Sequence, residues 1–187
     1  MYVGQVRILL PIFKNTPNLM KNIIYACVLT LLADSHSVAQ DEKAWFDFWV
    51  GKWEASWTET DGKIGKGTNT ITKILDNTVI QENFKIEEGT SKGYLGTSIS
   101  VYNPQKKKWH QGYADNQGAY FNLVGEREGD KRIFKTETVT QGDKQIILRM
   151  VFYDIKENSM MWDWESTEDG GKTWKLNWRI NYKRTAG

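Results

Sequence analysis

Turn-forming residues recur at short intervals along most of the chain, and this spacing restricts the fold more than any other feature. Asp61-Gly62, Asn116-Gln117-Gly118, Gln141-Gly142-Asp143 and Asp169-Gly170-Gly171 are each typical of a hairpin connection. The runs between such turns have the length and the alternation of β-strands. This pattern predicts an all-β antiparallel meander. Closure into a barrel would remove the exposed edges, and a flattened sandwich is the alternative.

Alternation also predicts which side chains share a face. Apolar residues occupy the even positions of 146–152, and the same phase runs from Trp174 through Trp178 to Tyr182. If these phases point inward, the interior is lined by aromatic residues, namely Trp53, Trp57, Phe84, Phe152, Trp162, Trp164, Trp178 and Tyr182. The one stretch with a helical pattern is Asp41–Val50, which predicts a short helix before the first strand.

The beginning of the chain carries an apolar run that predicts an export signal. Ile23–Ala33 has the length of a signal-peptide core, Lys21 precedes it, and Ser37-Val38-Ala39 fits cleavage before Gln40. We therefore expect residues 1–39 to be a leader, with the signal peptide at 20–39 and a misread start at 1–19. A single domain would occupy 40–187. The predicted location is periplasmic or extracellular, with no stable membrane insertion after cleavage.

Removal of this leader changes which charges and reactive groups remain. The chain has 25 Lys and Arg and 23 Asp and Glu, and 22 of each lie after residue 39. A near-neutral domain has no basic field to attract nucleic acid. Cys27 and His36 lie in the predicted leader, so His110 is the only imidazole left and no thiol remains. We therefore expect no metal, no cofactor and no cysteine chemistry.

The stretch STEDGGKTW, Ser166–Trp174, fits the pattern Ser/Thr-x-Asp-x-Gly-x-x-Trp and resembles the Asp box of sialidases. It occurs once, whereas a sialidase propeller is built from several blades. We therefore expect a structural role. Asp169 would accept backbone N–H bonds, Gly171 would permit a positive φ, and Trp174 would fold over the hairpin.

Residues near the two ends of the domain resemble the calycin signature. Gly51 and Trp53 form a Gly-x-Trp at the start of the first strand, and the last strand carries Arg179. In lipocalins and fatty-acid-binding proteins, a basic residue of the last strand covers this tryptophan and closes the barrel floor. Arg179 lies on the polar phase of its strand, which leaves Lys183 or Arg184 as alternatives. The resemblance implies a calycin-like β-barrel.

Longer blocks are similar to the DUF1579-like family of secreted bacterial proteins of unknown function. The blocks are FDFWVGKWE, GYLGTSISVYNPQKKKWHQGYADNQGAYFNLVGE and RMVFYDIKENSMMWDWESTEDGGKTWKLNWRINYKR. They occur in order over nearly all of residues 40–187. This resemblance implies export and a calycin-like barrel, and it transfers no catalytic residue.

The inward aromatic phase predicts a binding site for a small, largely apolar molecule, without catalysis. Aromatic side chains would supply the contact surface, and a few polar groups would orient the ligand. The predicted ligand-binding residues are Trp57, Glu82, Phe84, Gln111, Tyr113, Arg149, Trp162, Trp164 and Trp178. In the alternative, the aromatic side chains pack on one another and fill the interior.

Glu82 is the sharpest anomaly, because its carboxylate shares the inward phase of Phe84. A buried carboxylate without a partner has a raised pKa and is a candidate acid, base or ligand anchor. An isomerase, lyase or hydrolase that uses Glu82 is therefore the alternative function. We expect instead a structural ion pair of Glu82 with Arg149 or Arg179, which would remove that alternative. Arg149 is either this partner or, as in fatty-acid carriers, the group that binds a ligand carboxylate.

The remaining polar residues predict structural or solvent-exposed roles. Asp163 and Glu165 are expected to pair with lysines of the last strand, His110 to face solvent, and Asp115 to cap the turn that follows it. A third function, a domain that grips a polysaccharide or a protein through surface aromatic residues, depends on exposure of Trp45, Trp49, Trp109 and Trp174.

Overall fold

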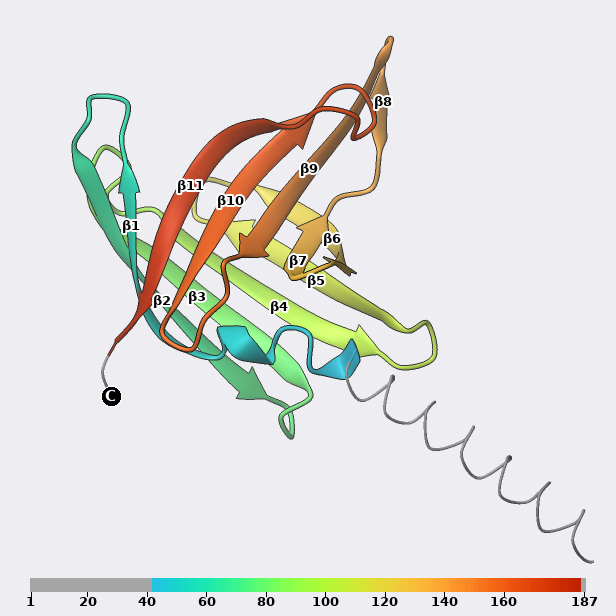
Figure 1. Cartoon of the computed structure of the whole chain (residues 1–187), viewed down its shortest axis with the longest axis horizontal. Helices are drawn as coiled ribbons and strands as arrows, with labels where there is room; N and C mark the ends of the chain where they lie inside the picture. Colours follow the sequence, from blue (N-terminus) through green and yellow to red (C-terminus); the bar gives the residue numbers. More distant parts are fainter. Residues whose placement is uncertain (1–41, 186–187) are drawn as a thin grey trace, which may run out of the picture. The chain divides into compact units, whose positions relative to one another are not determined.

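The computed structural model describes residues 42–185, so the predicted leader lies outside the described residues. Eleven strands follow one another along the chain (Figure 1). They are β1 (Gly51–Thr58), β2 (Ile64–Ile74), β3 (Val79–Glu88), β4 (Leu95–Asn103), β5 (Lys108–Asp115), β6 (Tyr120–Glu128), β7 (Lys131–Lys135), β8 (Val139–Gln141), β9 (Lys144–Tyr153), β10 (Ser159–Thr167) and β11 (Lys175–Arg184).

Ten of these strands close into an antiparallel barrel, which confirms the predicted all-β barrel. Neighbours along the chain pair with each other, β1 pairs with β11, and β7 pairs with β9. The short β8 lies outside this ring and pairs only with the start of β9. In Figure 1, β9, β10 and β11 cross over β2 to β5, so these two groups of strands face each other across the interior.

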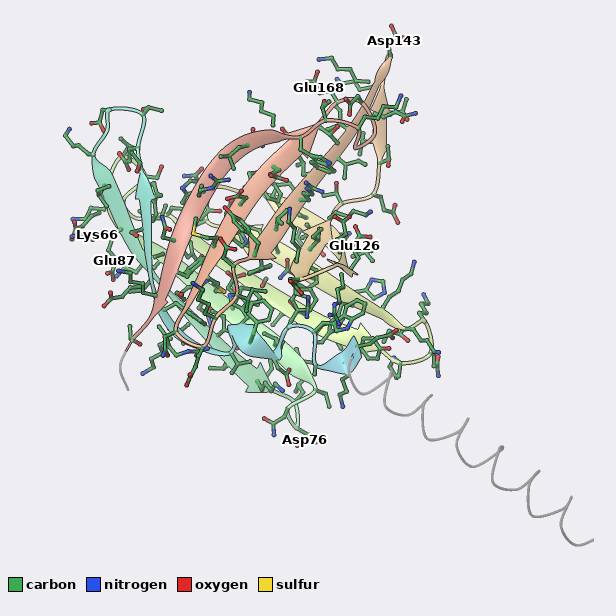
Figure 2. The ribbon with its side chains drawn as sticks, viewed as in Figure 1. Lys66, Asp76, Glu87, Glu126, Asp143 and Glu168 are labelled. Carbon is green, nitrogen blue, oxygen red and sulfur yellow. The ribbon has the colours of Figure 1, made fainter. Side chains whose placement is uncertain are left out.

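The charged side chains labelled in Figure 2 lie on the outside of the barrel and at its loop tips. The inner phase of β3 follows the prediction, since Ile80, Phe84 and Ile86 are buried while Asn83 and Lys85 are exposed. On this strand, the side chains that were predicted to face the interior do so.

The segment before β1 contains less helix than predicted. Among the described residues of this range, 42–50, the 3-10 turn η1 (Asp47–Trp49) directly precedes the first strand. A longer helix is not confirmed. The backbone N–H groups of Trp49 and Val50 donate to the carbonyls three residues before them, at 3.2 Å each, so this turn is wound more tightly than an α-helix.

This segment covers one end of the barrel (Figure 1) and supplies the centre of the core there. Phe46 is fully buried, stacks on Phe134 with 4.2 Å between ring centroids, and meets the edge of Trp109 at 5.2 Å. The Trp109 indole N–H donates to the Glu42 carbonyl at 2.8 Å, and Lys73 pairs with Asp47 at 2.8 Å. These contacts join strands that are distant in the sequence to the segment at residues 42–50, which we call the plug.

A cation covers the tryptophan of Gly51-x-Trp53, but it is Arg184, and the prediction of Arg179 is wrong. The Arg184 guanidinium carbon lies 4.1 Å from the centroid of the Trp53 ring. Gly51 has φ +141°, and a Cβ at that position would lie 2.0 Å from Arg184 Nη1. Arg184 ends the last strand opposite Trp53, whereas Arg179 lies in mid-strand on the outer face.

A β-bulge changes the phase of β11, and it corrects the predicted alternation there. Trp164 pairs with Trp178, but the next residue, Glu165, pairs with Leu176. One extra residue in a strand moves everything beyond it to the opposite face. Trp178 therefore faces the interior, whereas Leu176 is 43% exposed and Trp174 lies outside.

The Asp box forms the structural turn that its residues predict. Asp169 accepts hydrogen bonds from the backbone N–H groups of Lys172 and Thr173 at 2.9 and 3.0 Å. Gly171 has φ +95°, and the Trp174 indole N–H donates to the Gly171 carbonyl at 3.1 Å. The hydroxyls of Thr167 and Thr173, together with these N–H groups, hold the pKa of Asp169 far below its usual range.

Candidate functional site

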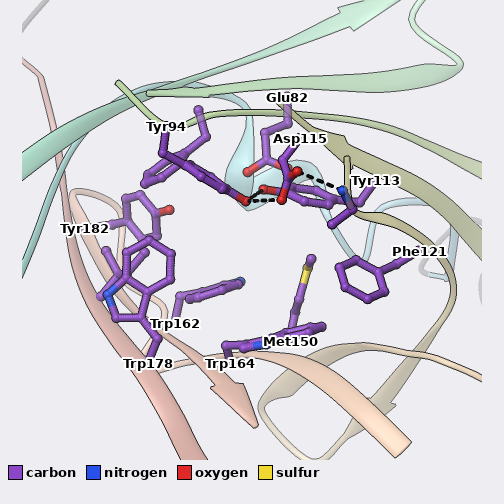
Figure 3. A pocket seen from close by; sticks show the side chains of 13 residues that line it. Glu82, Tyr94, Tyr113, Asp115, Phe121, Met150, Trp162, Trp164, Trp178 and Tyr182 are labelled. Carbon is purple, nitrogen blue, oxygen red and sulfur yellow. Dashed lines mark hydrogen bonds between the residues drawn. The ribbon is translucent and has the colours of Figure 1, made fainter. Parts of the chain in front are cut away.

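The half of the interior away from η1 contains a cavity of about 230 Å³. The interior thus has a packed half and a half with a cavity, and β5 runs through both. Trp109 at its start packs on the plug, while Tyr113 and Asp115 at its end face the cavity. Figure 3 shows the lining side chains. They are Glu82, Phe84, Tyr94, Tyr113, Asp115, Ala119, Phe121, Met150, Trp162, Trp164, Trp178, Ile180 and Tyr182.

One wall of the cavity is made of indoles from β10 and β11. Trp162 and Trp164 are two residues apart on β10, so both point inward, with their rings nearly parallel at 5° and 6.4 Å between centroids. Trp178 stands at 87° to Trp162 with a centroid distance of 5.8 Å. All three side chains are only partly buried although they lie on the inner face. In this half of the interior the aromatic residues therefore do not fill the space by packing on one another.

The opposite wall carries Glu82, and Figure 3 shows its carboxylate on the far side from Trp162 and Trp164. Glu82 is 7% exposed. Its oxygens accept hydrogen bonds from Asn69 Nδ2 at 2.8 Å and from the Ser98 hydroxyl at 2.7 Å. Burial raises the pKa of the Glu82 carboxyl, while these two hydrogen bonds act in the opposite direction.

Glu82 has no ion pair with any of the described residues, so the predicted pairing with Arg149 or Arg179 is wrong. Both arginines lie on the outer face. Arg149 Nε is 2.6 Å from a Glu165 oxygen, and Arg179 Nη2 is 2.6 Å from an Asp163 oxygen. The two acids thus pair with arginines across the strands and not with the predicted lysines. The wrong partner for Glu82 is explained by the alternation of side chains along β9. Arg149 lies between two inward residues of this strand, so its side chain points away from the cavity.

A buried polar network continues from Glu82 along the barrel wall. Asn69 Nδ2 also donates to the Tyr182 hydroxyl at 3.3 Å. On the other side, the Gln111 amide donates to the hydroxyls of Ser98 and Ser100 at 3.2 and 3.0 Å. The Asn69 Oδ1 and Gln111 Oε1 acceptors are buried without a donor among the described residues. This wall therefore has more acceptors than donors.

A second polar group lies near Glu82, at the end of β5. The Tyr94 hydroxyl donates to Asp115 at 3.0 Å and shares a hydrogen bond of 2.5 Å with Tyr113. Asp115 also accepts from the backbone N–H groups of Gln117 and Ala119, both at 2.9 Å, which confirms its role as cap of the turn.

The ionisation of these groups differs. Burial alone would raise the pKa of Asp115, but the hydrogen bonds from Ala119, Gln117 and Tyr94 outweigh it and hold the pKa below its usual range. Burial raises the pKa of Tyr94 to about 12 and that of Tyr113 higher still. At neutral pH Asp115 is therefore ionised, and Tyr94 and Tyr113 keep their protons.

Six of the nine predicted ligand-binding residues line the cavity: Glu82, Phe84, Tyr113, Trp162, Trp164 and Trp178. Three predicted residues do not. Trp57 packs edge-on against Trp178 with 5.1 Å between centroids, Gln111 belongs to the buried network, and Arg149 lies on the outer face under Trp174.

Several lining residues were missed by the sequence reasoning, among them Tyr94, Asp115, Phe121 and Met150. Tyr94 lies in the connection between β3 and β4, where no alternation indicates a direction. Met150 shares the predicted inward phase of β9 and could have been found from it. Tyr182 was predicted to face the interior and does so.

Two of the four tryptophans of the predicted surface site are buried. Trp49 and Trp109 are each 2% exposed and belong to the core. Trp174 is covered by Arg149, whose guanidinium carbon lies 3.6 Å from the ring centroid. His110 lies on the outer face of β5, between Val101 and Val124 of the neighbouring strands.

Residues 42–185 contain neither a metal site nor a membrane-spanning helix. No three or more His, Cys, Asp and Glu side chains come together as a metal site. Helices of the length and apolarity needed to cross a membrane are not found in that range. No protein-family model matches this sequence, and no curated protein matches it.

We expect Glu82→Gln to stabilise the protein at neutral pH. The folded-state pKa of Glu82 lies above its usual value of 4.5, so the folded protein keeps a proton that the unfolded chain loses. The contribution of Glu82 to the free energy of unfolding is fully present below pH 4.5. It is lost as the pH rises from 4.5 through the higher pKa of the folded protein. Glutamine stays neutral at every pH, so the variant does not lose this contribution as the pH rises.

Melting temperatures between pH 4 and 8 test this expectation. The gain should grow with pH and reach about 1 kcal/mol, or roughly 3–5 °C for a domain of this size. Glu88→Gln is the matched control, because Glu88 ends the same strand and is exposed. A difference between Glu82→Gln and the wild type that does not vary with pH would contradict the expectation.

Proposed function

We propose that this protein is an exported calycin-like carrier that binds a small, largely apolar molecule in its barrel and does not transform it. The observation that carries the proposal is the cavity, with three indoles on one wall and a few hydrogen-bonding groups on the other. Concave sites with this division of apolar and polar lining are typical of small-molecule binding. An engineered cavity of about 150 Å³ holds benzene, so 230 Å³ suits a ligand of one substituted ring.

Two further parts of the proposal are supported, one by a contact in the structure and one by the sequence. The contact of Arg184 with Trp53 supports a calycin-like barrel, since it is the closure expected from the Gly-x-Trp signature. Membership of the DUF1579-like family and export to the periplasm or beyond are supported by the blocks and the leader described above.

We expect binding of small neutral aromatics to change the tryptophan emission, because three of the nine tryptophans line the cavity. Toluene, benzyl alcohol, 2-naphthol and naphthalene form a suitable panel. Ala119→Phe should weaken binding by at least about tenfold, a loss of about 1.4 kcal/mol of contact, because it places a ring in the cavity. Unchanged emission across the whole panel would contradict the proposed function.

The control is Val139→Phe, which adds the same ring at a residue that is 61% exposed on β8, outside the barrel. It should bind the panel as the wild type does. Equal losses in both variants would show that the probes do not report on the cavity.

An acid–base enzyme is the second candidate, and the position of Glu82 favours it. The carboxyl lines the cavity, has a raised pKa and lacks an ion pair among the described residues. These are properties of a general acid or base. Once a substrate is found, an unchanged rate in Glu82→Gln would exclude this candidate.

A further inference from the structure

The charges that line the cavity are all negative. Among the thirteen lining residues there are two carboxylates, Glu82 and Asp115, and no lysine, arginine or histidine. Arg149 and Arg179 could have received an anionic ligand, but both point outward to their own carboxylates. A ligand carboxylate would thus enter a poorly solvated space next to Asp115 with no cation to pair with.

The polar wall has more hydrogen-bond acceptors than donors. The Glu82 carboxylate can accept about four hydrogen bonds and receives two. Asn69 Oδ1, behind it, has no donor among the described residues. Buried acceptors are almost always satisfied in folded proteins. A ligand that brings N–H donors would complete the set at Glu82.

The indole wall is suited to a positive charge. Trp162 and Trp164 present parallel rings, and Trp178 stands at a right angle to Trp162, so the three rings form a corner. The face of an indole attracts a cation within about 6 Å, and tryptophan is the strongest aromatic partner for this interaction. The same wall accepts the apolar part of the molecule.

We propose that the ligand is a small organic ammonium ion, a protonated amine attached to about one ring. Its N–H groups would donate to Glu82 and lie within the field of Asp115, with the apolar part and the flank of the ammonium group against Trp162, Trp164 and Trp178. This proposal rests on the proposed function and narrows it to cationic ligands. A carrier of fatty acids would need an inward arginine to pair with the ligand carboxylate, and no arginine is among the lining residues.

Three ligands of similar size and different charge test the proposal by calorimetry. They are 2-phenylethylammonium, its neutral counterpart 2-phenylethanol, and phenylacetate. We expect the ammonium ion to bind at least about tenfold more tightly than the alcohol, and phenylacetate more weakly than both. The N,N,N-trimethyl form of the ammonium ion keeps the charge but has no donor, and it should bind more weakly than the parent.

Glu82→Gln should reduce the affinity for the ammonium ion by about 10- to 100-fold and that for the alcohol by less than threefold. Glu88→Gln, on the outside of the same strand, should change neither. Melting curves show whether each variant is folded. If Glu82→Gln does not fold, the order of the wild-type affinities and their comparison with Asp115→Asn decide the question.

The outcomes separate the two proposals. If none of the ligands binds, including the neutral aromatics, the proposed function fails and the cation proposal with it. If the alcohol or phenylacetate binds as tightly as the ammonium ion, the cation proposal is overturned while the proposed function stands. A loss in Glu82→Gln that is equal for ammonium ion and alcohol also overturns it.

Discussion

Replacement of Phe46 by alanine is expected to lower the free energy of unfolding by about 3–5 kcal/mol. The ring is fully buried and contacts Phe134, Trp109 and Phe152, with centroid distances of 4.2, 5.2 and 6.2 Å. Its removal would leave a void under the barrel, because these neighbours belong to different strands and cannot all move inward. The loss therefore includes both the transfer of the ring and the cavity that remains.

Phe121→Ala is the matched control, because this ring lines the cavity and already meets empty space on one side. Its loss should be about 1–2 kcal/mol, since fewer contacts disappear. Urea unfolding followed by circular dichroism measures both variants without depending on the tryptophans. Equal losses would show that the plug is no more tightly packed than the cavity wall.

Arg184→Ala is expected to cost about 2–4 kcal/mol, the second largest effect. The guanidinium donates to three backbone carbonyls: Val50 at 2.8 Å, Phe48 at 3.0 Å and Glu157 at 2.9 Å. It also lies over Trp53. One side chain thus joins the segment before β1, the turn before β10 and the end of β11.

Arg184→Lys should recover only a small part of this stability. Lysine keeps the charge, but a single ammonium group cannot reach three carbonyls in different directions as the planar guanidinium does. Gly51→Ala should be destabilising by an independent route, because the added Cβ would displace Arg184. The control is Lys183→Ala, an exposed neighbour on the same strand. Full stability of Arg184→Lys in urea unfolding would show that the charge alone closes the floor.

The features that were predicted correctly depend on residues close together in the chain. The hairpin turns and the alternation along β3 needed only nearest neighbours, because side chains of a strand alternate between its two faces. The Asp box and the capping role of Asp115 are likewise contained within a few residues. The inward position of Glu82 followed from the same alternation.

Two of the errors arose from the pairing of one strand with another. The cation over Trp53 is Arg184 and not Arg179, because the register of β1 against β11 decides which residue lies beside the tryptophan. The bulge that turns Trp174 and Leu176 outward is visible only when β10 and β11 are paired. Register is a property of two strands together, so no pattern within either one contains it.

Local chemistry alone therefore established that this chain forms hairpins, which of its strand faces are apolar, and that one acid lies among the inward residues. Tertiary structure decided that Glu82 meets amides and hydroxyls, that the arginines pair with acids outside, and that three indoles leave a space open. The physical reason is that charge pairing and cavities depend on distances between residues far apart in sequence, and these distances are set only when the barrel closes.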